Sequence, residues 1–258
     1  MKRRSWLVLS LPWVTTLAII ALQEVLARTG VLPDVIPPFS ETVVATWNLL
    51  PTPVFLASIA QTLQQFVISL AIGVVGGVLL GILIGILPVA NQLLRYVIEF
   101  LRFTPSVVYI PILLLLMGAK PQVAIILAAL GAMWPVLYQT YYGVVGVSPV
   151  LKDTGRVFGL TRAQQLQSIT LPSLSPFLAT GIRIAAAHAL IVVVAVQIIA
   201  AVPGIGRDIQ TYAENGVFPQ MYGLILVVGI IGLLVNSLLE LVEKRQLHWH
   251  ASYREKQA

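Results

Sequence analysis

Four polar side chains interrupt long apolar runs of this sequence, and they are the best placed to act on a solute. Arg183, His188 and Gln197 share one run, and Gln61 lies in another. Polar groups are costly in lipid and usually face a cavity or a partner, so all four are candidate pathway residues. Arg183 could attract an anion, or it could reach lipid headgroups or neighbouring carbonyls. His188 and Gln197 are nine residues apart, which places them on opposite sides of a helix.

Catalytic chemistry has few candidates. The absence of cysteine excludes thiol catalysis and thiolate metal sites. No H-E-x-x-H, G-x-S-x-G or G-x-x-x-x-G-K-[ST] string occurs. His248 and His250 could bind a metal ion, but beside Trp249 in a basic tail they are more typical of an interfacial anchor. The sequence therefore predicts no catalytic residue, no metal site and no nucleotide site, and so no enzyme.

The most informative polar segment is 148–172. Ser148 can open a helix, with Asp153 near its positive end, and Gly159 can end it in the left-handed conformation. A second helix is expected over 161–170. Two interpretations are open: the segment docks into a groove of a cytoplasmic protein, or it is an amphipathic connector on the membrane surface.

A glycine ladder marks an earlier apolar run, with Gly73, Gly77, Gly81 and Gly85 spaced every four residues. That spacing keeps all four on nearly the same helix face. A face without side chains lets a neighbouring helix approach closely, which holds helices together in lipid. We expect a packing face here in preference to a ligand site.

The composition requires a membrane. Of 258 residues, 58% are hydrophobic and only 10% are charged, and the mean hydropathy is +0.91. Soluble domains carry about 25% charged residues. The net charge of +6 could suggest nucleic acid, but in so apolar a chain it indicates basic residues on one side of a bilayer.

Charge-free runs long enough to cross a bilayer predict an all-α protein with six spans. They fall at 6–27, 54–87, 104–117 (beginning earlier, near 94), 123–142, 174–200 and 221–241. The first resembles a secretory signal, but it runs too long and lacks a cleavage pattern, so we expect an uncleaved span. With the N-terminus inside, most of the 16 Lys and Arg residues lie on the inner side, which predicts both termini in the cytoplasm.

Three regions are expected. Residues 1–53 hold the first span and an outer loop, in which Ser40 would cap a short helix beginning near Glu41. Residues 54–245 form a core of five spans that includes the segment 148–172, and residues 246–258 form a cytoplasmic tail.

Segment 148–172 resembles the EAA loop of ABC-importer permeases, E-A-A, three residues, G, nine residues, I-x-L-P. The spacing matches throughout; the glycine and the I-x-L-P match outright, and the first three letters match weakly. The resemblance implies that this loop couples transport to an ATPase through Asp153, Thr154, Gly155, Arg156, Gly159, Ile169, Leu171 and Pro172.

The wider sequence is similar to nitrate, sulfonate, taurine and bicarbonate permeases, in segments 36–43, 58–85, 104–118, 181–185, 204–206 and 238–249. The chain departs from many relatives at Gln197, where they carry an acidic residue, and at Leu190, where they often carry Trp; His188 is unusual there. These departures affect the expected substrate more than the expected fold.

The resemblance implies the type I ABC-importer (MetI-like) permease fold in a prokaryotic cell membrane. It also implies partners: a second, identical permease copy, two cytoplasmic ATPases that bind ATP and Mg, an extracytoplasmic solute-binding protein and lipid, but no nucleic acid. The expected cargo is a small anion of the sulfonate, nitrate or bicarbonate class. The alternatives are an ATP-independent channel or secondary carrier, and a membrane protein with no transport role.

Overall fold

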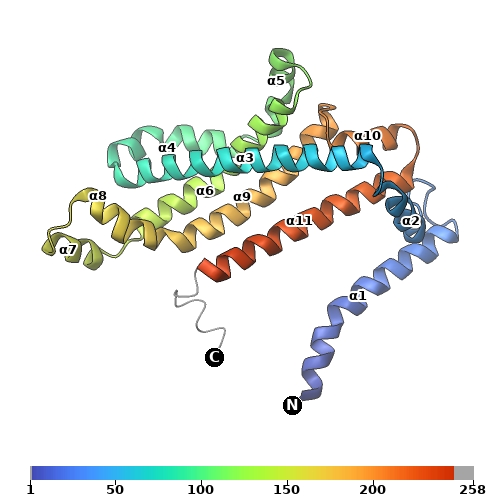
Figure 1. The fold of residues 1–258 in the computed structure, drawn as a ribbon, viewed down its shortest axis with the longest axis horizontal. Helices are drawn as coiled ribbons and strands as arrows, with labels where there is room; N and C mark the ends of the chain where they lie inside the picture. Colours follow the sequence, from blue (N-terminus) through green and yellow to red (C-terminus); the bar gives the residue numbers. More distant parts are fainter. Residues whose placement is uncertain (1, 247–258) are drawn as a thin grey trace.

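The computed structural model describes residues 2–246, and the regular elements found there are helical (Figure 1). Of the tail expected at 246–258, residues 247–258 lie outside the described residues, and these include His248, Trp249 and His250. The elements are α1 (Lys2–Arg28), α2 (Phe39–Leu49), α3 (Pro53–Ile86), α4 (Pro88–Phe103), η1 (Ser106–Tyr109), α5 (Ile110–Met117), α6 (Pro121–Val145), α7 (Pro149–Val157), α8 (Arg162–Gln165), η2 (Leu166–Thr170), α9 (Leu171–Ile199), α10 (Ile205–Glu214) and α11 (Phe218–Gln246).

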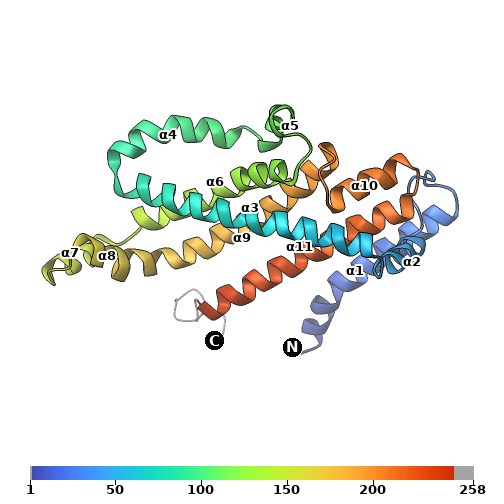
Figure 2. The ribbon, with the colours of Figure 1, turned by 45° about the horizontal axis from the view of Figure 1, so that its top comes forward.

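Long helices run along one axis of the molecule, some of the shorter helices lie at its two ends, and α5 projects from its middle (Figures 1 and 2). The helices α3, α6, α9 and α11 extend in that direction, with α7 and α8 at one end and α2 and α10 at the other (Figures 1 and 2). The helix α1 diverges from this bundle. Within the described residues, five helices are long and apolar enough to cross a membrane: Ser10–Arg28, Pro53–Ile86, Pro121–Val145, Arg162–Ile199 and Phe218–Gln246.

The third expected span is wrong as a continuous helix. The chain forms α4 and then η1 with α5, and the two parts are bent by 83°. The break falls at Thr104 and Pro105, both in extended conformation. Proline supplies no backbone donor and disfavours helical geometry in the residue before it, so the helix ends there. The described residues therefore hold six candidate crossings only if the bent pair counts as one.

The centre of the molecule is the contact between α3 and α6, made through the glycine ladder. An added Cβ at Gly73 would lie 2.8 Å from Cβ of Ala132, and one at Gly77 would lie 2.7 Å from the backbone oxygen of Met133. Gly81 and Gly85 face α6 in the same way. No side chain fits at these positions, so the two helices approach backbone to backbone.

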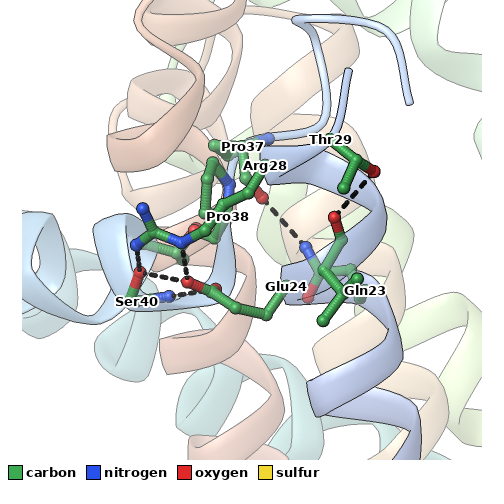
Figure 3. Close-up of polar contacts among 9 residues, drawn as sticks. Gln23, Glu24, Arg28, Thr29, Pro37, Pro38 and Ser40 are labelled. Atoms are coloured by element: carbon green, nitrogen blue, oxygen red, sulfur yellow. Dashed lines mark hydrogen bonds and ion pairs between the residues drawn. The ribbon is translucent and has the colours of Figure 1, made fainter. Parts of the chain in front are cut away.

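Polar contacts attach α1 to α2 at the end of the molecule where α10 also lies (Figure 3). Arg28 bonds to Glu24 at 2.6 Å and donates to the Ser40 hydroxyl at 2.9 Å. Glu24 accepts from the Ser40 backbone amide at 3.0 Å, and Gln23 donates to the carbonyl of Pro37 at 2.9 Å. Ser40 is therefore not the expected cap of α2: the helix begins at Phe39, and the hydroxyl binds α1 instead.

Candidate functional site

The helix α7 begins after Ser148 and ends at a glycine, as the sequence predicts. Gly159 has a φ of +70°. Its amide donates to the carbonyl of Arg156 at 2.9 Å, and the amide of Leu160 donates to the carbonyl of Gly155 at 2.9 Å. This pair of bonds satisfies the last carbonyls of a helix and requires a left-handed residue. An added Cβ at Gly159 would meet nothing within 4 Å, so the backbone conformation alone favours glycine there.

The return of the loop differs from the expected separate helix over 161–170. The short α8 opens with a capping box between Thr161 and Gln164. It continues through the π-helical turn η2 directly into α9. The end of the loop is therefore continuous with a helix that is long and apolar enough to cross a membrane, Arg162–Ile199.

Gly155 joins the two halves of this loop. It is the one buried residue of α7, and an added Cβ would lie 2.8 Å from Cδ1 of Ile169 and 3.3 Å from Cγ of Gln165. The side-chain amide of Gln165 donates to the carbonyl of Leu160 at 3.1 Å. Gly155 thus packs α7 against Ile169, two residues before α9 begins.

The remaining surface of α7 is open. Val157 and Phe158 are 85% and 79% exposed, and Val150 is 72% exposed. Asp153 and Arg156 form an exposed ion pair with an N–O distance of 3.0 Å. Thr154 bonds within the helix, to the carbonyl of Val150. At the far end of the loop, Leu171 is 40% exposed and Pro172 lies in the first turn of α9. Apolar side chains beside charged ones make a surface suited to a protein partner.

The candidate pathway residues separate in the structure. His188 is exposed and lines a cavity of about 440 Å³ between α6, α9 and the break after α4. Gln61 is exposed on α3. Arg183 forms an ion pair with Glu243, which joins α9 to α11. Gln197 is fully buried.

Gln197 is the hub of a buried network. Its Oε1 accepts from the Gly206 amide at 3.0 Å and from the Thr62 hydroxyl at 3.2 Å, and its Nε2 donates to Oε1 of Gln65 at 3.0 Å. Gln65 donates in turn to the carbonyl of Pro203 at 2.8 Å. The network binds α3, α9 and the start of α10 together.

Arg102 is a cavity residue that was not among the candidates predicted from the sequence. Arg102 lines the same cavity as His188, and its guanidinium lies 4.6 Å from the ring centroids of Phe103 and Tyr138. Pro105 could have indicated this role from the sequence, because a proline three residues after Arg102 predicts that the helix ends beside it. Among residues 2–246, no cluster of His, Asp and Glu could hold a metal ion.

Comparison with known proteins decides the family. Residues 73–248 match the family described as "Binding-protein-dependent transport system inner membrane component". The chain belongs to this family. It is thus a multi-pass permease of the bacterial plasma membrane and a component of an ABC importer.

Curated relatives of this permease cover most of its length. The putative aliphatic sulfonates transport permease protein SsuC of Escherichia coli is 28% identical over 256 residues, 99% of this chain and 97% of that protein. The nitrate import permease protein NrtB of Leptolyngbya laminosa is 28% identical, covering 80% of this chain and 77% of that protein. Both are named as permeases, not as catalytic subunits.

The permease also shares its fold with a solved structure. An inward-facing conformation of the MetNI methionine ABC transporter aligns with a TM-score of 0.63 at 18% identity, covering 76% of this chain and 95% of that chain. The expected all-helical, MetI-like permease fold is confirmed.

Proposed function

We propose that this permease imports a small anionic solute by alternating access, driven by ATPases that bind the segment 148–172. Two identical copies would enclose the pathway, two cytoplasmic ATPases would bind ATP and Mg, and a solute-binding protein would deliver cargo from outside. Both termini would be cytoplasmic, with the bent pair α4 and α5 acting as the sixth crossing. The sulfonate, nitrate, taurine and bicarbonate permeases among the relatives support a small anion as cargo.

One observation carries this proposal: an exposed helix is mechanically joined to a membrane helix. The apolar and charged surface of α7 faces away from the bundle, while Gly155 packs on Ile169 directly before α9. Closure of the ATPases on ATP would displace α7, and η2 would transmit that displacement to α9. Rigid-body transmission of this kind turns a local event into a change of the whole bundle.

The remaining site residues have assigned roles in this proposal. Asp153, Thr154 and Arg156 would present the docking surface, and Gly159 would fix its angle. Leu171 and Pro172 would begin the helix that moves. Arg183, bound to Glu243, would hold α9 to α11 during that movement, and Gln61 would lie near the outer entrance.

The test is Gly159→Val, because valine strongly disfavours the left-handed conformation that ends α7. We expect loss of the ATPase from the purified complex, or ATP hydrolysis without uptake. Gly216→Val is the matched control. Gly216 has the same φ of +70°, and a Cβ added there would also meet nothing within 4 Å, but it lies after α10 at the other end of the molecule (Figure 1). Normal assembly and coupled uptake in Gly159→Val would contradict the proposal. Equal losses in both variants would also contradict it, since backbone strain would then be the cause.

An ATP-independent channel or carrier is the weaker alternative. The relatives are ABC permeases, and the membrane-embedded Arg183 is already bound to Glu243. Co-purification with an ATPase separates the two functions directly.

A further inference from the structure

The cavity that contains His188 is placed where a solute would be held midway across the bundle. Its walls come from α6, α9 and the break between α4 and η1. His188 lies near the middle of the 29-residue α9, and Arg102 lies one residue before the end of α4. Irregular backbone at membrane depth is tolerated where it lines a cavity, and ionisable residues there mark solute pathways.

Three polar side chains of the cavity have no partners of their own in the described part of the chain, while a fourth, Thr104, donates to the carbonyl of Phe100. Among residues 2–246, Arg102, Gln139 and His188 make no side-chain hydrogen bond or ion pair, and Arg102 rests only on aromatic rings. The carboxylate of Glu99, on the same helix as Arg102, is bonded to Arg95. The cavity therefore offers an uncompensated cation and hydrogen-bond donors, which is the chemistry that binds an oxyanion.

The rest of the wall is apolar. Val107, Trp134, Ile184 and Val192 line the same cavity. At about 440 Å³ it falls within the range of small-molecule pockets, about 300–1,000 Å³. Nitrate and bicarbonate have no apolar part to bury against such walls, whereas an aliphatic sulfonate has both an oxyanion and a hydrocarbon tail.

We propose that this cavity is a binding site within the permease for an organic oxyanion with a short apolar tail, of the aliphatic sulfonate class, with Arg102 and His188 binding the charged group. The inference rests on the proposed function and makes it more specific. It assigns to the permease a selectivity separate from that of the solute-binding protein, and it assigns to Arg102 a role in solute binding.

The test measures binding of radiolabelled ethanesulfonate to the purified complex of permease and ATPase, without the solute-binding protein. Nitrate, bicarbonate and ethylammonium serve as competitors. Ethanesulfonate should bind saturably, nitrate and bicarbonate should compete more weakly than unlabelled ethanesulfonate, and ethylammonium should not compete. Arg102→Gln and His188→Gln should each weaken binding by about 10-fold or more, the effect expected for a lost hydrogen bond to a charged group. Arg207→Gln, an exposed arginine of α10 that does not line the cavity, is the matched control and should bind as the wild type does.

Several outcomes would overturn the inference: absence of saturable binding, binding unchanged in both variants, or nitrate binding as tightly as ethanesulfonate. If Arg102→Gln does not assemble, His188→Gln and Ser106→Ala decide the question, since Ser106 also lines the cavity. A complex that assembles and couples normally but does not bind ethanesulfonate refutes only this site. A permease that never binds an ATPase refutes the proposed function itself.

Discussion

Two polar residues of α9, His188 and Gln197, lie nine positions apart on the same helix and have opposite surroundings. Gln197 is fully buried and bonds to three other residues, from α3 and the start of α10. His188 faces a cavity and bonds to none of the residues that the structure describes. One face of α9 thus uses polarity to hold helices together, and the other leaves polarity available to a solute.

The helix α6 likewise has one face packed against a neighbouring helix and another face that lines the cavity. One face packs on the glycine ladder of α3, and the other contributes Trp134, Tyr138 and Gln139 to the cavity. A polar residue in a membrane helix is therefore not by itself a sign of transport. What distinguishes the two roles is whether its hydrogen-bonding groups are already satisfied, which the sequence does not show.

The largest expected effect is on the packed face, at Gln197→Leu. This change removes the acceptor of the Gly206 amide and the partner of Gln65, and it leaves both buried groups unpaired. We expect a loss of about 3 kcal/mol in the free energy of unfolding, since each orphaned buried group costs about 1–3 kcal/mol. Denaturant titration of the purified permease measures it.

Gln197→Glu is the control for that change. A protonated glutamate keeps an acceptor for the Gly206 amide and a donor for Gln65, so its loss of stability should be clearly smaller than that of Gln197→Leu. Equal losses in the two variants would show that the shape of the side chain matters and the hydrogen bonds do not.

For Gly77→Ala we expect a smaller loss in the free energy of unfolding, about 1–3 kcal/mol. The added methyl group meets the backbone oxygen of Met133, which cannot move without shifting α6. Gly76→Ala is its neighbour and matched control: the nearest atom to its added Cβ is Sδ of Met133, at 3.4 Å. We expect the control to keep or slightly raise stability, since alanine favours helices. The unfolding titrations of the two variants, compared directly, test whether the ladder is a packing face.

The sequence predicted much of this fold because lipid restricts what a chain can do. Charge-free runs must be helices, and the ends of the observed α3, α6, α9 and α11 lie within a few residues of the ends of the expected spans. The prediction was wrong at the third span, where length and hydropathy suggested one helix although Pro105 breaks it. The end of α7 was predicted correctly because a left-handed glycine is a local signal.

The candidate site was harder to predict because its grouping depends on distant contacts. The partners of Gln197 at Thr62 and Gln65 are more than 130 residues away in sequence. Nothing local distinguishes that glutamine from His188. Arg102 was not a predicted candidate, because only the bend after α4 brings it to the cavity.

The smallest expected effect on stability belongs to His188→Leu. Its side chain is exposed to the cavity and makes no hydrogen bond among the described residues, so its loss leaves no buried group unpaired. The unfolding free energy should stay within about 0.5 kcal/mol of the wild type, as for substitutions away from buried networks. Uptake by the assembled transporter should nevertheless fall. A variant that is stable but transports poorly would separate the two faces of α9, whereas a loss of stability like that of Gln197→Leu would show that His188 also holds the bundle together.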